Sequence, residues 1–279
     1  MDLNAILINA GFVALYIVLF FVSKWIKGWF SNYVLDQQLT EMDNNAVSVS
    51  VAGYFIGVTI LFVGIMDGPS QENIGLEFLI VTGYSLAGIL LLNLARLVNK
   101  QFILYKFSVD KEIIQDQNPG TGVVEGATYV ASGMVIAGAV HGQGGGPLTA
   151  IVFYLLGQIA LILFSFIYAK TTSYDVHDEI EKDNLAAGLG FAGGMISIGI
   201  IVMRAVSGDF VSWSQDLMIF GLDLLIVFIY LFVVRLVFDR FILRNSNMEQ
   251  EIVHDKNVGA GLLEMMVAIC FSVVLFFVL

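Results

Sequence analysis

The chain has 279 residues, of which 58% are hydrophobic and only 13% are charged, and its formal net charge at pH 7 is −11. A soluble domain carries about 25% charged residues, so a chain this apolar has too little polar surface to cover a water-soluble core. The acidic balance argues against a nucleic-acid partner, because a phosphate-binding surface needs clustered Lys and Arg. The single cysteine, Cys270, excludes a disulfide framework within the chain and a cysteine-based metal site.

The apolar residues form eight long blocks rather than alternating along the chain. The blocks cover residues 3–23, 46–66, 78–95, 120–140, 148–169, 185–203, 217–234 and 258–279. A helix needs about 20 apolar residues to cross a hydrocarbon core about 30 Å thick, so every block is long enough or nearly so. The first block lacks the basic start and the small-residue cleavage motif of a signal peptide. The sequence therefore predicts an all-α fold, a polytopic membrane bundle of about eight transmembrane helices.

A short motif opens every second block. It consists of Asn, any residue, Ala or Gly, any residue, Ser or Gly, then Val or Leu, and it begins at Asn44, Asn118, Asn184 and Asn257. Asn44 to Asn118 is 74 residues and Asn184 to Asn257 is 73, while the two halves are offset by 140 and 139 residues. A two-helix unit that doubled, and then doubled again, explains these spacings. Because each repeat crosses the membrane twice, the four repeats are parallel.

The duplication divides the chain into a first four-helix unit, residues 1–143, and a second, residues 144–279. Basic residues gather in the loops before the motifs and in the adjoining helix ends, whereas the opposite face contains Arg204 alone. Basic loops stay in the cytoplasm. We therefore predict that the Asn-motif loops are cytoplasmic and that both termini lie outside. The four repeats either surround one central axis or form two four-helix bundles side by side.

The motif itself has two interpretations. Asn is among the best N-cap residues, and the residue four positions later is always small, which allows close packing of helices in lipid. These small residues are Ser48, Gly122, Gly188 and Gly261. The motif then supplies helix caps and a packing ridge. Alternatively, four Asn-bearing helix starts surround a polar opening.

Acidic residues inside the blocks are the main candidates for a functional site. Glu125 and Glu264 each stand seven residues after a motif Asn, about 10 Å into the helix, at equivalent places in the two halves. A third acid, Asp223, lies inside the seventh block. Few cations are near them in the sequence, since Arg204 and His141 lie towards the outer face. The acids indicate either a proton or cation pathway, or protonated carboxyls that each make one interhelical hydrogen bond.

Other motifs carry no chemistry. The chain has no His-Glu-x-x-His motif and no hydrolase arrangement, so we predict that it is not an enzyme and holds no cofactor and no metal. The Gly-rich segment 141–147 lacks the Gly-Lys-Ser/Thr ending of a phosphate-binding loop. We interpret it as a connector between the two halves.

The Asn motif, opening a Gly- and Ala-rich crossing twice in each four-helix unit, resembles the YjfL-like bacterial inner-membrane proteins, whose domain has no known function. The stretch nearest to that family is Asn184-Leu-Ala-Ala-Gly-Leu-Gly-Phe-Ala-Gly, and the resemblance covers nearly the whole chain as two such domains in tandem. The chain departs from the pattern at Asn45-Ala-Val and at Pro119. The resemblance implies a multi-pass protein of the bacterial inner membrane with an even number of helices, and it brings no substrate.

Two functions from different classes follow as hypotheses. The first is a channel-like or proton-coupled conduit for small ions that uses Glu125 and Glu264 as a pair and Asp223 as an outer relay. The second is a non-transporting membrane scaffold, whose acidic cytoplasmic loops recruit an envelope-stress protein or an enzyme. The partners to expect are therefore the lipid bilayer, a small cation or proton, a further copy of the chain, and a cytoplasmic protein.

Overall fold

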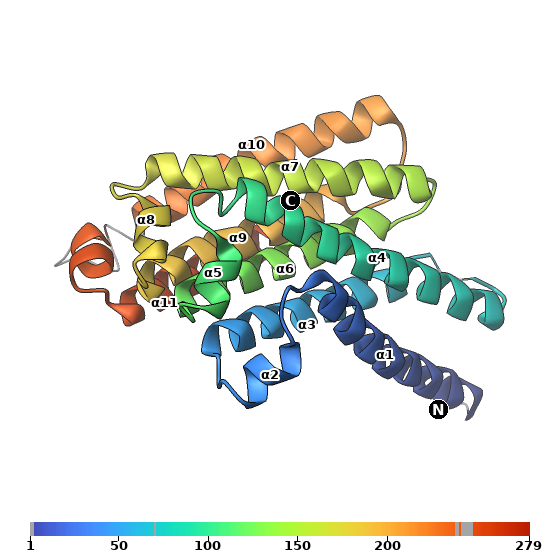
Figure 1. The fold of residues 1–279 in the computed structure, drawn as a ribbon. Coiled ribbons are helices and arrows are strands. Elements are labelled where there is room, and N and C mark those ends of the chain that lie inside the picture. The colour runs from blue at the N-terminus through green and yellow to red at the C-terminus, as the bar shows by residue number, and fades with distance from the viewer. Residues whose placement is uncertain (1–2, 70, 238–239, 241–247) are drawn as a thin grey trace.

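The structure, a computed structural model, describes residues 3–69, 71–237, 240 and 248–279 (Figure 1). Its long helices are α1 (Leu3–Phe30), α3 (Asn45–Met66), α4 (Ile74–Phe102), α6 (Pro119–Val140), α7 (Pro147–Thr171), α9 (Leu185–Val206), α10 (Trp213–Val237) and α11 (Val258–Val278). Each is long and apolar enough to cross a membrane, and no strand occurs in the described ranges. The predicted all-α fold with eight transmembrane helices is confirmed.

A short helix precedes each motif helix. These are α2 (Leu35–Thr40), α5 (Val109–Ile114), α8 (Val176–Glu181) and the π-helix η2 (Gln250–His254). One residue before each motif Asn, the backbone is left-handed, with φ of 48° at Asp43, 51° at Gln117, 62° at Asp183 and 46° at Lys256. A side chain costs about 1–2 kcal/mol in this conformation. Its recurrence in all four repeats shows that one turn geometry leads each short helix into the long helix that follows.

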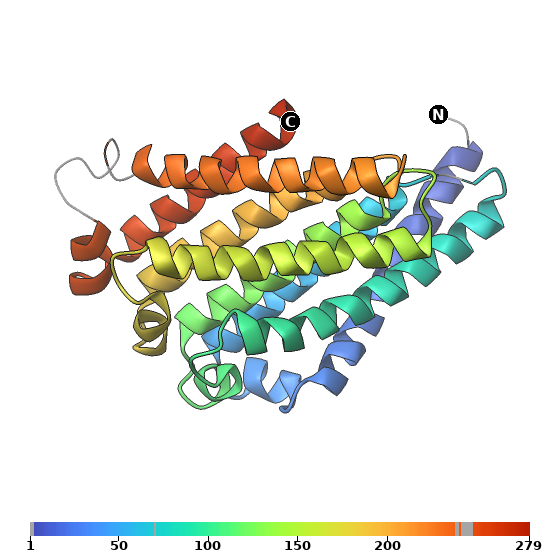
Figure 2. The ribbon, with the colours of Figure 1, turned by 90° about the horizontal axis from the view of Figure 1, so that it is seen from above.

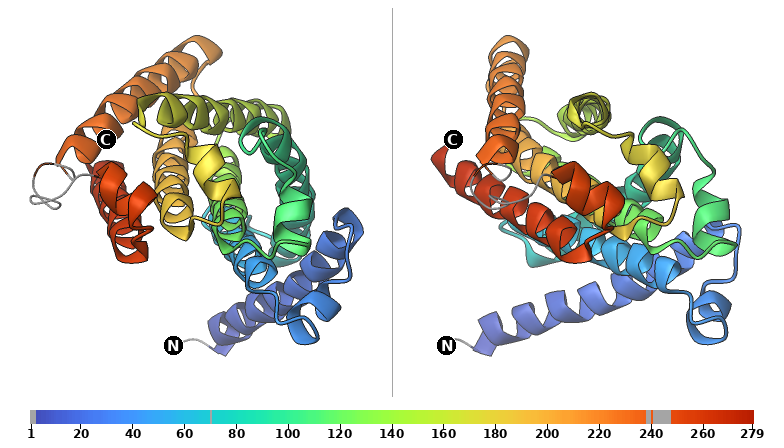
Figure 3. Two further views of the ribbon diagram at one scale, coloured as in Figure 1. Left: turned by 60° about the vertical axis from the view of Figure 1, so that its left-hand side comes forward. Right: turned by 90° about the vertical axis from the view of Figure 1, so that its left-hand side faces the viewer.

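The long helices form two layers (Figures 2 and 3). The motif helices α3, α6, α9 and α11 make an inner row, each packed against the next. The helices α1, α4, α7 and α10 form an outer layer, in which α4 lies against α3 and α6, α7 against α6 and α9, and α10 against α9 and α11. All four inner helices start from the side of the short helices, so the repeats are parallel as predicted.

The inner row is open rather than closed around an axis. Among the described residues, α3 packs substantially on α6 alone within this row, and α11 packs on α9 alone. The contact between α6 and α9 joins the two four-helix units through the same kind of packing that joins α3 to α6. Of the two arrangements left open by the sequence, the central axis is therefore not observed, and the two units lie side by side as one continuous row.

Glycines bring the backbones of the inner helices into direct contact. A Cβ atom placed on Gly57 would lie 2.6 Å from the carbonyl oxygen of Tyr129, and one on Gly133 would lie 2.6 Å from that of Gly57. A Cβ on Gly188 would lie 2.8 Å from the Cα and the oxygen of Gly120. Even a methyl group would force these helices apart. At Gly83 of α4, outside the row, there is open space, and nothing lies within 4 Å of a Cβ.

Replacing Gly188 with Ala should therefore lower the free energy of unfolding by about 1–3 kcal/mol, the usual cost of overpacking. The matched control is Gly83→Ala, another helical glycine, which should be neutral or slightly stabilising because Ala favours helix. Reversible unfolding in mild detergent measures both variants. Equal effects at the two positions would contradict backbone contact at Gly188.

Candidate functional site

Each motif Asn caps its helix, and the first three also bridge to the next repeat. The side-chain oxygen of Asn44, Asn118, Asn184 and Asn257 accepts a hydrogen bond from the N–H three residues later, at 3.1 to 3.2 Å. The amide nitrogen donates to a side chain of the preceding short helix, which is Gln38 for Asn44 and Glu112, Glu179 and Glu251 for the others. In the first three repeats it also donates to a backbone carbonyl of the following repeat. The first three Asn residues thus form a row of bridges, and the four do not surround an opening.

Glu125 lies in a buried ion-pair network. It is 2% exposed, and its Oε1 accepts a hydrogen bond from Nε of Arg96 at 2.8 Å, while Oε2 accepts one from the hydroxyl of Ser50. Arg96 is 3% exposed and also donates to the Phe30 carbonyl at 3.0 Å and to Asp110 at 3.1 Å. A buried carboxylate is tolerated when a cation and hydrogen bonds compensate for its lost hydration.

The expectation that few cations lie near the intramembrane acids is therefore wrong for Glu125. In the sequence Arg96 directly follows the third apolar block, 29 residues before Glu125, and therefore reads as a charge near a loop. Antiparallel packing of α4 on α6 brings the two side chains to the same depth. The signal that could have revealed the pair is the register of the two helices, because Arg96 lies six residues before the end of α4 and Glu125 lies six residues after the start of α6.

Lys27 lies beside this network. Its side chain is 1% exposed, and Nζ donates to the Tyr129 hydroxyl at 2.9 Å. The ammonium lies 4.4 Å from the centre of the Tyr129 ring and 4.9 Å from that of Tyr54, where ring faces attract a cation. The Tyr54 hydroxyl in turn donates to the Ser23 carbonyl at 2.8 Å. Four helices, α1, α3, α4 and α6, are thus joined by one polar cluster.

Glu264 occupies a different environment in the second half. It is 8% exposed and accepts a hydrogen bond from the Tyr168 hydroxyl at 3.3 Å. It lines a cavity of about 70 Å³ whose other walls are mostly apolar side chains of α7, α9, α10 and α11. Tyr168 stands three residues before the end of α7, where Lys27 stands in α1. Gly190 of α9 leaves room for the carboxyl, in the register that Ser50 has beside Glu125.

Asp223 does not join the glutamates. It lies ten residues into α10, which starts at the face away from the short helices, whereas Glu264 lies six residues into α11, which starts at the face of the short helices. At about 1.5 Å per residue, Asp223 is roughly 15 Å from the start of α10 and Glu264 roughly 9 Å from the start of α11, so the two carboxyls are counted from opposite faces. Asp223 is partly exposed and does not line the cavity beside Glu264. The three acids named in the sequence are therefore at three separate places.

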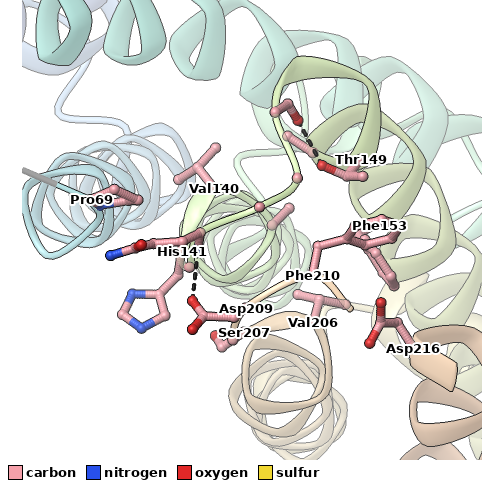
Figure 4. Close-up of a pocket in the computed structure, with 18 of the residues that line it drawn as sticks. Pro69, Val140, His141, Thr149, Phe153, Val206, Ser207, Asp209, Phe210 and Asp216 are labelled. Carbon is pink, nitrogen blue, oxygen red and sulfur yellow. Dashed lines mark hydrogen bonds between the residues drawn. The ribbon is translucent and has the colours of Figure 1, made fainter. Parts of the chain in front are cut away.

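A larger pocket of about 780 Å³ opens at the face away from the short helices (Figure 4). The Gly-rich segment after α6 and the turn after α9 line it together, and the backbone N–H of Gln143 donates to Asp209 at 2.7 Å. Positive φ values at Gly142 and Gly208, of 101° and 122°, allow these turns. The connector predicted from the sequence thus also forms a pocket wall, which sequence reasoning missed. Neither glutamate lines this pocket.

His177 links α8 to the end of α4. The side chain is 1% exposed, and Nε2 lies 2.7 Å from the carbonyl oxygen of Ile103. Because a carbonyl can only accept, Nε2 carries the proton in this bond. Burial disfavours the charged imidazolium, and this lowers the pKa of His177 below its ordinary value of 6.5.

The DUF350 model, described as a domain of unknown function, matches residues 1–140 and again residues 144–279. The chain belongs to this family. A UPF0719 transmembrane protein of Aquifex aeolicus (strain VF5) is 24% identical over 266 residues, which cover 91% of this chain and 93% of that protein. No solved structure shows a significant match. The chain is therefore an integral membrane protein of the DUF350 family with two tandem copies of the domain, and the narrower YjfL-like label is not supported by these matches.

The Arg96–Glu125 pair predicts a strongly non-additive mutant cycle. Arg96→Met or Glu125→Leu alone strands a buried charge and should cost about 3–5 kcal/mol of unfolding free energy. The double variant should cost clearly less than the sum of the two. Lys24→Met, which breaks the exposed Lys24–Asp36 pair, is the control and should cost less than about 1 kcal/mol. Additive single effects would show that the pair does not couple.

His177 predicts a loss of stability in mild acid. Because its pKa is lowered in the folded chain, the unfolded chain binds more protons as the pH falls through 6.5, so the free energy of unfolding decreases. The drop in Tm between pH 7.5 and pH 5.5 should be smaller in His177→Asn than in the native chain. His254→Asn, at an exposed position, should keep the native drop. An unchanged drop in His177→Asn would refute this role.

Proposed function

We propose that the chain is a non-transporting scaffold of the bacterial inner membrane, with the face of the short helices in the cytoplasm. The observation that carries the proposal is the environment of Glu125. Its carboxyl is held by Arg96 and Ser50, and neither of the cavities described above is lined by it. A conducting carboxylate must exchange its partners with a passing ion, and an enclosed ion pair opposes this exchange.

The packing of the inner row supports the same proposal. The helices touch backbone to backbone at Gly57 and Gly133, which leaves no space between α3 and α6 for a hydrated ion. The row is open, so no axis surrounded by four equivalent helices exists among the described residues. Intramembrane charge in the first half then serves to hold four helices in register.

A scaffold needs a surface that binds its partner. In the acidic loop before α9, only some of the carboxylates are free to bind one, because the others bind residues of this chain. Asp175 and Asp178 both bind Lys106, and Glu179 binds Lys182 and Asn184. These three acids hold the fold of the loop together. Glu181 and Asp183 are exposed, and their carboxylates make no hydrogen bond or ion pair within the described part of the chain. These two are the acids we assign to a basic cytoplasmic partner.

A proton or cation site at Glu264 is the second candidate function. The observation in its favour is the cavity of about 70 Å³ that the carboxyl lines between α7, α9, α10 and α11. Its walls are mostly apolar, which suits a single proton better than a hydrated ion. In this function Asp223 would act nearer the outer face.

Flux through purified protein in liposomes separates the two functions. Proton, K⁺ and Na⁺ movement is measured for the native chain, Glu125→Gln, Glu264→Gln and the double variant, with folding checked by size-exclusion chromatography. The scaffold predicts native flux equal to that of protein-free liposomes. Flux that is lost in Glu264→Gln and kept in Glu125→Gln would favour the second candidate. Flux that needs both carboxyls would favour a conduit through the glutamate pair and overturn the scaffold.

A further inference from the structure

The three junctions between neighbouring repeats share one hydrogen bond. The amide of Asn44 donates to the carbonyl of Ile113 at 2.9 Å, that of Asn118 to Ile180 at 2.7 Å, and that of Asn184 to Ile252 at 2.7 Å. Each accepting residue is at the same place in its short helix. It directly follows the residue whose carbonyl accepts a hydrogen bond from the backbone N–H of that repeat's own motif Asn. The bond therefore always runs from one repeat to the short helix of the following repeat.

The same junctions share one backbone contact. A Cβ on the fourth residue after the motif Asn of the later repeat would lie 2.8 Å from the Cα of the second residue after the motif Asn of the earlier repeat. This distance is 2.8 Å for Gly122 against Ala46, for Gly188 against Gly120 and for Gly261 against Ala186. The junction is thus one interface used three times. Its donor side, on the earlier repeat, consists of the motif Asn and the second residue after it. Its acceptor side, on the later repeat, consists of the short-helix carbonyl and the fourth residue after the Asn.

The last repeat presents a donor side that nothing in the described chain occupies. Asn257 is exposed, whereas the other three motif Asn residues are buried. Its amide donates to Glu251 at 2.7 Å but, within the described residues, to no backbone carbonyl. A Cβ on Gly259 would meet only the side-chain oxygen of Asn257, whereas at the equivalent Gly120 it would also meet the backbone of Asn184.

The first repeat presents the matching acceptor side. Leu39 directly follows Gln38, whose carbonyl binds the N–H of Asn44, so its carbonyl is the equivalent of those of Ile113, Ile180 and Ile252. No residue in the described ranges donates to it. Ser48, the equivalent of Gly122, is partly exposed, and Ala52, one turn further, is exposed.

The helix α1 leaves this part of the first repeat open. It packs on the outer half of α3, where the Tyr16 hydroxyl lies 2.8 Å from that of Thr59 and the Phe20 ring stacks on Phe55. Towards its end α1 turns to α4 and α6, since Lys27 binds Tyr129 and the Phe30 carbonyl binds Arg96. Among the described residues, no hydrogen bond or ring contact joins α1 to α3 before Tyr54, so the first turns of α3 remain uncovered by α1.

We propose that the donor side at Asn257 docks on the acceptor side at Leu39 of a second copy of this chain. The amide of Asn257 then donates to the carbonyl of Leu39 of the second copy. Gly259 faces Ser48 of that copy, and because Ser48 stands where the internal junctions have glycine, its side chain sets a wider spacing between the two helices than those junctions have. Lipid offers no hydrophobic drive between helices, so close backbone approach and an interhelical hydrogen bond are the forces that assemble them. The contact is head-to-tail, and such contacts build closed rings or open rows. The inference is independent of whether the chain conducts ions.

Cysteine cross-linking in membranes tests this contact. The full chain is first made cysteine-free with Cys270→Ser, and Ser48→Cys and Gly259→Cys are then introduced together. The internal junctions place these two positions close enough for a disulfide. Mild oxidation should convert at least half of the double variant into dimers and larger products. The matched collision control carries Gly83→Cys and Gly221→Cys, two glycines of the outer layer with nothing within 4 Å of a Cβ.

The single variants decide the geometry of the contact. Head-to-tail docking predicts that neither Ser48→Cys nor Gly259→Cys alone cross-links above the collision control. Cross-linking of either single variant would mean a two-fold contact between like ends and would overturn the proposal. Cross-linking of the double variant no stronger than the control would overturn it as well. Size-exclusion chromatography in mild detergent confirms that each variant is folded.

Discussion

The close approach of helix backbones along the inner row is the constraint on which the rest of the structure depends. In lipid, helices gain nothing by hiding apolar side chains from their surroundings, so their association rests on packing contact and hydrogen bonds. Glycines at Gly57, Gly133 and Gly188 allow this contact. The Asn bridges then fix how far each helix slides along its neighbour, because the amide of one repeat must reach a carbonyl of the next.

Once the backbones are this close, the row has no room for a central opening, and the polar groups must be satisfied at the edges of the packing. In the first three repeats each motif Asn makes three hydrogen bonds: with a helix N–H, with a side chain of the short helix and with a carbonyl of the next repeat. An unpaired backbone group near hydrocarbon is costly, so these bonds stabilise the ends of the helices where the chain meets the interface.

The two halves are related by duplication, and the described partners of their equivalent glutamates are not the same. Glu125 meets Arg96 and Ser50, with Lys27 close by, and the cluster joins four helices. Glu264 meets Tyr168 and a small cavity instead. A lysine in the last turn of α1 and a tyrosine at the same distance from the end of α7 account for part of this difference.

The sequence by itself determined the class of the protein, its eight crossings and its four parallel repeats. These follow from apolar block length and from the spacing of Asn44, Asn118, Asn184 and Asn257, both of which are local or periodic signals. Small residues four positions after each Asn also marked where helices could touch, although they did not say which helices.

Only the tertiary structure decided that the repeats form an open row, that Arg96 faces Glu125, and that Asp223 lies apart from both glutamates. The reason is physical. Depth along a helix can be counted from the sequence, but the rotation and neighbour of each helix depend on the packing of all eight. The charge that compensates Glu125 comes from another crossing, so no local pattern around Glu125 contains it.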